Sequence, residues 1–267
     1  MFKVGILGVG NMGEAILNGI INSSILKPSE ILIYDNNRER VETLVEKYDV
    51  AAASDVKNLV NLSEIVFLAV KPKDFKSSIE STVEFFKEDK VVVSVMAGVK
   101  IEEIMDVIKR GYVVRTMPNT PALIGEGVIG VSFGFEKEEI EFRVLKMLSS
   151  LGLVVKVEES FLDVITGLSG SGPAYVFSFI DALAQGGVKM GLPYSQALEI
   201  AIQTVIGSAK LLRESKEHPA ILRDRVTSPA GTTIYGIHEL EKRNFRDAII
   251  SAVERATLRS RELSDKS

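Results

Sequence analysis

The chain has 267 residues, of which 46% are hydrophobic and 25% are charged, and its formal net charge is −4. This length suits two modest domains or one large one, and the ordinary composition argues against disorder and low-complexity fibres. The net negative charge argues against nucleic-acid partners. The absence of cysteine excludes disulfides, thiolate nucleophiles, zinc–thiolate sites and iron–sulfur clusters. We expect no metal.

Short β-rich runs alternate with amphipathic helical segments from the first residues to about residue 157. This alternation predicts right-handed βαβ crossovers and an α/β fold with a doubly wound, largely parallel sheet. The direction of the last two strands stays open, and an antiparallel edge is one arrangement that the sequence allows. The expected strands are Lys3–Leu7, Glu30–Tyr34, Ile65–Val70, Lys90–Val95, Tyr112–Thr116, Gly127–Ser132 and Leu153–Val157. The expected helices are Gly13–Ile21, Arg38–Lys47, Asp74–Phe86, Ile101–Lys109 and Glu138–Leu151.

A glycine-rich segment, Gly8-Val9-Gly10-Asn11-Met12-Gly13, connects the first expected strand to the first expected helix. Here the first glycine can turn the chain, the second lets a pyrophosphate approach, and the third lets the helix pack on the strand. Free N–H groups at the helix start attract anionic oxygens. The pattern predicts a Rossmann-type dinucleotide-binding domain over residues 1–157, and a purely structural glycine turn is the alternative. The loop residues expected at the cofactor are Gly8, Gly10, Asn11, Met12 and Gly13.

The residues after the second strand give conflicting signals about cofactor choice. Asp35 lies 22 residues beyond Gly13 and favours the free ribose diol of NAD(H). Its charge would repel an added phosphate unless the carboxylate turns away. Asn36, Asn37 and Arg38 could hold the 2′-phosphate of NADP(H), although Arg38 also fits a solvated side chain at a helix start. Both cofactors therefore stay open at this point.

Two further segments, Ala69–Pro72 and Ala97–Gly98, lie at or just past the carboxyl ends of central strands, the edge where open α/β sheets bind ligands, and a third candidate lies in a rigid loop. In the first segment, Lys71 is either a ligand contact or an ordinary surface charge. Asn119 lies in an extended loop between two prolines, where its amide could fix a nicotinamide carboxamide or a substrate, and an ordinary turn is the alternative. The residues expected at the cofactor here are Ala69, Val70, Lys71, Pro72, Ala97, Gly98 and Asn119.

Helical periodicity replaces the alternation over residues 158–267. The segments Ala174–Leu183 and Ala197–Leu212 are apolar almost all round, and such helices must be covered on several sides. We therefore expect an all-helical C-terminal domain that forms a homodimer, with a self-contained bundle as the alternative. No apolar run reaches the roughly 18 residues that span a bilayer, and the chain opens directly into a strand pattern. We expect a cytoplasmic protein without a membrane partner.

The sequence offers no good proton donor for the reduction of a carbon–oxygen bond. The two histidines, His218 and His238, fit structural positions better than catalytic ones. The segment Gly167-Leu168-Ser169-Gly170-Ser171-Gly172 resembles in placement the loop by which β-hydroxyacid dehydrogenases introduce a catalytic lysine, but Val176 occupies the lysine position. A carbon–nitrogen double bond fits better, because an iminium already carries positive charge and accepts hydride without a strong acid.

A second candidate anion site lies in the segment Thr227-Ser228-Pro229-Ala230-Gly231-Thr232-Thr233. Ser228 is a plausible helix cap and Pro229 a plausible first helical residue. The N–H groups of Gly231, Thr232 and Thr233 would then be unpaired and able to bind a carboxylate, while the Thr233 hydroxyl could bond a ring nitrogen. A capped helix without a ligand is the alternative.

Together these motifs resemble those of the pyrroline-5-carboxylate reductase family. The resemblance covers nearly the whole chain. It is most specific in the segment Asp224–Glu241, and it also rests on Gly8–Gly13, Ala69–Pro72, Met117–Pro121 and Gly170–Tyr175. It implies reduction of 1-pyrroline-5-carboxylate, a small imino acid, to L-proline by NADP(H), with NAD(H) kept open. It also implies a homodimer with interleaved helical domains, and further assembly is left open.

The resemblance also implies roles for particular residues. Thr233 would be catalytic, and the residues expected at the substrate are Ala230, Gly231, Thr232, Thr233, Ser171 and Gly172. Two positions depart from the family pattern: Val56 stands where many members carry an asparagine that contacts the adenosine ribose, and Asp35 opposes the phosphate of NADP(H). The alternatives are another imine reductase, a β-hydroxyacid dehydrogenase-like enzyme, and a protein that senses NADP without turnover.

Overall fold

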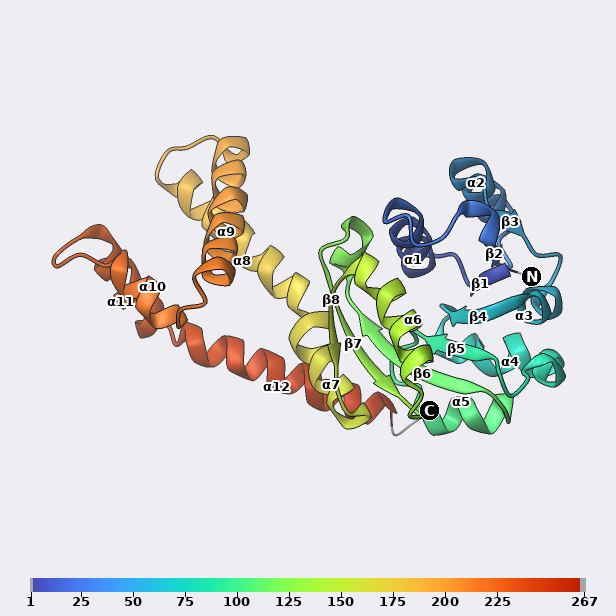
Figure 1. The fold of residues 1–267 in the computed structure, drawn as a ribbon. Coiled ribbons are helices and arrows are strands. Elements are labelled where there is room, and N and C mark those ends of the chain that lie inside the picture. The colour runs from blue at the N-terminus through green and yellow to red at the C-terminus, as the bar shows by residue number, and fades with distance from the viewer. Residues whose placement is uncertain (1, 265–267) are drawn as a thin grey trace. The chain divides into compact units, whose positions relative to one another are not determined.

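The computed structural model describes residues 2–264, which divide into two units (Figure 1). The first unit holds residues 2–171 and 255–264 of the described chain, and the second holds residues 172–254. The sequence analysis placed a boundary between residues 157 and 158. The units divide later because α7 (Leu162–Ile165) packs on the sheet: a Cβ added to Gly130 would lie 3.0 Å from both Leu162 and Ile165 side-chain atoms.

One mixed sheet forms the centre of the first unit, in the order β3-β2-β1-β4-β5-β6-β7-β8. Neighbouring strands run parallel from β3 to β6, β7 is antiparallel to β6, and β8 is parallel to β7. The last two strands therefore form the antiparallel edge that the sequence had left open. The strands are β1 (Phe2–Leu7), β2 (Ile31–Tyr34), β3 (Ala51–Ala52), β4 (Ser63–Leu68), β5 (Val91–Ser94), β6 (Tyr112–Pro118), β7 (Gly127–Phe133) and β8 (Gly152–Lys156).

Helices cover both faces of this sheet because the central strands are apolar on both sides. In β4, Ile65 and Phe67 belong to one buried cluster, whereas Val66 and Leu68 belong to the other, as the two-residue period of a strand requires. The helices packed in the first cluster are α1 (Asn11–Asn22), α2 (Arg38–Tyr48) and α6 (Glu138–Leu148). Those packed in the second are α3 (Val56–Leu62), α4 (Phe75–Ile79) and α5 (Ile101–Ile108).

The helix expected over Asp74–Phe86 is wrong in extent. The chain forms a 3₁₀ turn before α4 and a 3₁₀ segment, Glu80–Phe85, after it. Three hydroxyls donate to nearby backbone carbonyls: Ser77 to Asp74, Ser78 to Phe75 and Thr82 to Ile79. Such local bonds compete with regular helix formation and account for the interruptions.

The second unit consists of helices, yet few of its side chains are buried. Its buried apolar core consists of Ala184, Ala197 and Ala201, while large side chains such as Phe177 and Tyr235 are 63% and 71% exposed. Three alanines cannot offset the entropy of ordering these helices, so the unit needs apolar surface from a second chain. These exposed side chains favour a partner subunit over the self-contained bundle as the cover for residues 172–254. The helices are α8 (Gly172–Lys189), α9 (Tyr194–Ser215), α10 (Pro219–Arg225), α11 (Thr232–Lys242) and the first half of α12 (Phe245–Ser264).

Across residues 2–264, no helix combines the length and the apolar character that crossing a bilayer would require.

A buried polar cluster lies where α3 meets β4. The Lys90 ammonium donates to the carbonyls of Val60, at 2.8 Å, and Ser63, and its burial lowers the pKa of Lys90 below the ordinary value. The Ser63 hydroxyl is fully buried against Gly5 and has no hydrogen-bond partner within the described chain. A buried hydroxyl without a partner has lost its water bonds and gained nothing in exchange.

We expect Ser63→Ala to stabilise the protein by about 1 kcal/mol, which corresponds to a rise in Tm of roughly 2–4 °C. The matched control is Ser94→Ala, because the Ser94 side chain is equally buried but accepts the Met96 N–H at 3.2 Å. This control should lower Tm by a similar amount. Thermal unfolding of both variants at one protein concentration checks the pair, and a lower Tm for Ser63→Ala would contradict the assignment.

Candidate active site

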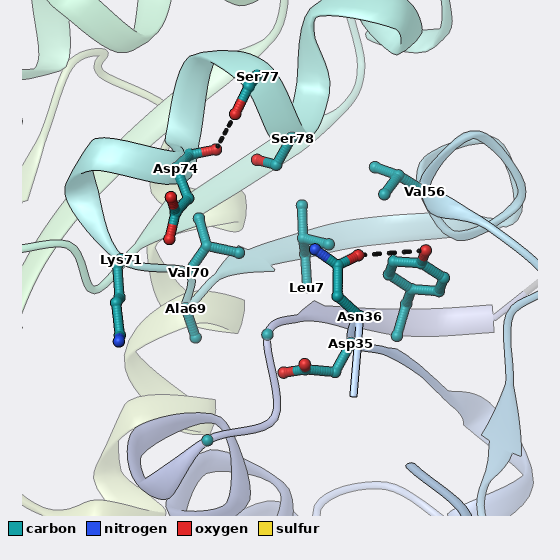
Figure 2. Close-up of a pocket in the computed structure, with 13 residues that line it drawn as sticks. Leu7, Asp35, Asn36, Val56, Ala69, Val70, Lys71, Asp74, Ser77 and Ser78 are labelled. Carbon is teal, nitrogen blue, oxygen red and sulfur yellow. Dashed lines mark hydrogen bonds between the residues drawn. The ribbon is translucent and has the colours of Figure 1, made fainter. Parts of the chain in front are cut away.

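The first unit brings most of the sequence-predicted cofactor residues to one edge of the sheet. A cavity of about 500 Å³ opens where β1, β2 and β4 end, and Figure 2 shows the side chains around it. Its lining consists of Leu7, Gly8, Gly10, Tyr34, Asp35, Asn36, Val56, Ala69, Val70, Lys71, Asp74, Ser77 and Ser78. The carboxyl edge of parallel strands is where such folds bind ligands, so this cavity is the candidate dinucleotide site.

The three glycines of the loop have the three different surroundings that their expected roles require. Gly8 has a φ of +92°, and an added Cβ would lie 2.7 Å from the Ala69 carbonyl oxygen. An added Cβ on Gly13 would lie 2.0 Å from the Gly8 carbonyl oxygen, so this glycine permits the close packing of α1. Around Gly10, in contrast, no described atom lies within 4 Å of the Cβ position. The open space is at the one glycine where a pyrophosphate would approach.

The start of α1 supplies donors for that space. Gly10 is the N-cap residue, and no side chain of the described chain caps the helix there. The first N–H groups of a helix have no partner within the helix, and they lie at its positive end. Asn11 and Met12 are the first two helical residues, but neither side chain lines the cavity. Their backbone N–H groups lie at the helix start, and a cofactor contact at these two residues stays a prediction.

Asp35 contacts the glycine loop itself. Its Oδ2 accepts the Val9 N–H at 2.8 Å and its Oδ1 accepts the Asn37 N–H at 2.9 Å. Figure 2 shows its carboxylate turned toward the loop. Beyond Asp35, a second cavity of about 250 Å³ is lined by Arg38, Glu42 and Ser54, among others, and it shares Tyr34, Asp35 and Asn36 with the first cavity.

The strand-end residues of β4 contribute as the sequence suggested, with additions. Ala69, Val70 and Lys71 line the cavity, whereas Pro72 begins the 3₁₀ turn and lies outside the lining. Sequence reasoning missed five lining residues, because three of them belonged to the segment expected as one helix, Asp74–Phe86, and the other two belonged to expected strands. The missed residues are Leu7, Tyr34, Asp74, Ser77 and Ser78. Val56 lines the cavity with an apolar side chain, as its departure from the family pattern implied.

Ala97 and Gly98 follow β5 but do not line this cavity. Gly98 has a φ of +80°, and the nearest atoms to an added Cβ belong to Ser264, at 3.7 Å. The loop is therefore turned at Gly98 as a glycine allows. A cofactor contact at these two residues stays a prediction.

Both polar ends of the Asn119 amide make hydrogen bonds inside the protein, and the expected contact with a cofactor stays a prediction. Its Oδ1 accepts the Val128 N–H at 2.8 Å, and its Nδ2 donates to the Ser169 carbonyl at 2.9 Å. The side chain is only 8% exposed. The Asn119 side chain joins the end of β6 to β7 and to the segment before α8. It therefore helps to hold these segments together and leaves at most one N–H for a ligand.

The expected helix start at Ser228 and Pro229 is wrong. Residues 228–231 form a turn in which the Gly231 N–H donates to the Ser228 carbonyl at 3.1 Å, and α11 begins at Thr232. Proline suits the second position of a turn as well as the first position of a helix, which is why the sequence misled. Ala230 has a φ of +57°, in the region that favours glycine. The Gly231 N–H is therefore not free for a ligand, whereas α11 starts without a side-chain cap in the described chain.

Thr233 is the second residue of α11 and is half-buried. Its hydroxyl makes no hydrogen bond with any described residue, so it can serve a ligand. Ser171 and Gly172 lie at the end of the first unit and the start of the second. The Ser171 N–H donates to the Thr166 carbonyl at 2.8 Å, which closes a π-helical turn, and such turns are frequent at functional sites. The space around a Cβ on Gly172 is open within the described chain.

The doubly wound sheet, the open glycine loop and the cavity at the strand ends define a Rossmann-type dinucleotide-dependent oxidoreductase. A pyrroline-5-carboxylate reductase of Synechocystis sp. is 42% identical over 265 residues, which cover 99% of each chain. The chain belongs to the pyrroline-5-carboxylate reductase family.

Family models and solved structures agree with this assignment. Residues 159–263 match the model for pyrroline-5-carboxylate reductase dimerisation, and residues 3–98 match the model described as NADP oxidoreductase coenzyme F420-dependent. The structure of a pyrroline-5-carboxylate reductase from Coxiella burnetii is similar, with a TM-score of 0.91 at 31% identity and 98% of each chain covered. A Plasmodium falciparum pyrroline carboxylate reductase with NADP bound has a TM-score of 0.88 at 29% identity, again with 98% of each chain covered.

Proposed function

We propose that this protein reduces 1-pyrroline-5-carboxylate to L-proline with hydride from NADPH, and from NADH as the second cofactor. The observation that carries the proposal is the full-length similarity to pyrroline-5-carboxylate reductases, which extends over both the glycine loop and the helical segment. The NADP in the Plasmodium falciparum structure supports the choice of cofactor. The open space at Gly10 fits a pyrophosphate.

The cofactor contacts follow from the cavity. The N–H groups at the start of α1 hold the pyrophosphate, and the residues that follow β2 and β4 line the adenosine side. Asn36, Arg38 and Lys71 provide polar or cationic groups there. The bound nicotinamide supplies the hydride. We retain Ala97 and Gly98 near it, as the loop that follows β5.

The substrate contacts fall on the second unit. The carboxylate accepts hydrogen bonds from the backbone N–H groups of Thr232 and Thr233, since the Gly231 N–H is already used in the turn. The Thr233 hydroxyl bonds the ring nitrogen. Hydride adds to the carbon of the C=N bond, and the nitrogen takes its proton from solvent before binding. Ala230, Gly231, Ser171 and Gly172 complete the substrate site through their backbone.

The proposed division of labour follows the two halves of the chain. Residues 1–157 bind the dinucleotide, and residues 158–267 bind the imino acid and form a homodimer whose dimers can assemble further. The exposed apolar side chains of α8 and α9 supply the association surface, with Phe177 63% and Ile200 56% exposed. Their exposure is the reason to place the dimer contact there.

Purified protein mixed with NADPH and 1-pyrroline-5-carboxylate should consume the cofactor, as followed by the loss of its absorbance, and should form L-proline. A panel of acyclic imines and β-hydroxyacids separates the two enzyme alternatives, because only a carboxylated cyclic imine should react well. Cofactor binding without turnover would favour the sensing protein. No consumption with either NADPH or NADH would reject the proposed activity.

A further inference from the structure

The backbone of Val9 in the glycine loop is held at both its N–H and its C=O by side chains that follow β2. Asp35 accepts its N–H at 2.8 Å, and the Arg40 Nε donates to its carbonyl at 3.1 Å. The Val9 side chain is fully buried. One residue of the loop thus has both of its backbone polar groups fixed by residues more than 25 positions away in the chain.

Arg40 is itself anchored. Its guanidinium also pairs with the carboxylate of Glu14 in α1, which accepts further bonds from Lys47 at 3.0 Å and Tyr48 at 3.3 Å. Partial burial of Glu14 raises the pKa of its carboxyl, but the hydrogen bonds from Lys47 and Arg40 outweigh this effect and hold that pKa below its ordinary value. The carboxylate therefore stays charged at neutral pH and keeps Arg40 in place.

These contacts change the role that we expect for Asp35 in cofactor binding. As a reader of the ribose diol it would select NAD(H) against NADP(H), because its charge would face the 2′-phosphate. Here each carboxylate oxygen already accepts a backbone N–H, at 2.8 and 2.9 Å, and these donors partly offset its charge. Arg38 and Glu42 line the second cavity together with Asp35, and their charges can distinguish the 2′-position, because Arg38 would attract a phosphate and Glu42 would repel it.

We propose that Asp35 and Arg40 are positioning residues that clamp the backbone of Val9, so that Asp35 sets the affinity for NADP(H) and NAD(H) alike, and that Arg38 and Glu42 choose between the two cofactors. This inference rests on the proposed function only in requiring that the protein binds nicotinamide dinucleotides. It explains how a chain with an aspartate after β2 can accept a phosphorylated ribose.

Calorimetric titration of the full-length protein with NADP⁺ and with NAD⁺ tests the clamp. Asp35→Asn keeps one accepting oxygen and loses the other, so one of the two backbone bonds breaks. Both dissociation constants should rise by about tenfold, with their ratio changed by less than about threefold. Arg40→Gln should act in the same direction on both cofactors. In steady state, KM should rise for both cofactors while kcat and KM for the imine stay within about twofold.

Two control variants distinguish a general loss of cofactor affinity from a change in the preference between NADP⁺ and NAD⁺. Arg38→Ala should weaken NADP⁺ by about tenfold and leave NAD⁺ unchanged. Glu39→Gln removes an exposed carboxylate from the same helix start without touching either cavity, and it should change neither constant. If Asp35→Asn bound NADP⁺ more tightly and NAD⁺ more weakly, Asp35 would select for the ribose diol and the proposed clamp would be wrong. Unchanged dissociation constants for both cofactors would also contradict the clamp. If the unmodified protein bound neither dinucleotide, the proposed function itself would fail.

Discussion

Gly13→Ala should unfold the protein at a temperature roughly 10 °C lower and should weaken NADP⁺ binding by more than about a hundredfold. The added Cβ would lie 2.0 Å from the Gly8 carbonyl oxygen, so α1 must move away from the loop. A backbone contact of this kind cannot be relieved by a side-chain rotation, and the cost is about 3 kcal/mol or more. Thermal unfolding and calorimetric titration measure the two effects.

Gly10→Ala is the matched control for this prediction. Gly10 has a φ of −66°, which alanine adopts readily, and no described atom lies near its Cβ position. Tm should therefore change by less than about 2 °C. NADP⁺ affinity should still fall by about tenfold or more, because the methyl group fills the space that the pyrophosphate needs. A Gly13→Ala protein with unchanged Tm, or a Gly10→Ala protein with unchanged affinity, would contradict these roles.

Thr233→Val should lower kcat for imine reduction by about a hundredfold or more. The variant keeps the shape of the side chain and the backbone N–H, but it removes the hydroxyl that we place on the ring nitrogen. The protonated imine nitrogen has no free lone pair and hydride addition creates one, so a hydrogen bond donated by this hydroxyl strengthens as the iminium becomes an amine. Because this hydroxyl bonds no described residue, its removal should not change Tm. The dissociation constant for NADP⁺ should also stay the same.

Thr233→Ser is the control, since it retains the hydroxyl and should keep kcat within about tenfold of the unmodified protein. Steady-state kinetics with 1-pyrroline-5-carboxylate separates the two variants. If Thr233→Val retained kcat within about threefold, the hydroxyl would have no part in the reduction, and the substrate nitrogen would need another partner.

The sequence predicted the sheet well because both faces of its strands are apolar. The run Ile65-Val66-Phe67-Leu68 alternates between the two buried clusters, and this pattern is visible without coordinates. The two-residue strand β3 and the helix α3 carried no such pattern and were missed. The turn at Pro229 could not be separated from a helix start, because one proline conformation serves both.

The candidate site was predictable in position but not in the use of its side chains. Strand ends and glycines depend on local sequence, so the cavity residues Gly8, Gly10 and Lys71 could be chosen in advance. The hydrogen-bond partners of Asn119 and Asp35 could not be predicted from the sequence. They are backbone groups of Val128, Ser169 and Val9, and only the folded chain brings them within hydrogen-bond distance.

Because the core of residues 172–254 consists only of alanines, we expect the affinity for the imino acid to depend on the concentration of the protein. The sheet unit has its own large core, whereas the helices of residues 172–254, on which we propose that Thr232 and Thr233 bind the imino acid, have almost none, so we expect order in these helices to depend on pairing with a second copy. A newly made, solitary polypeptide would thus hold nucleotide before it could hold imino acid. Pairing of copies then acts as the final maturation step of the enzyme.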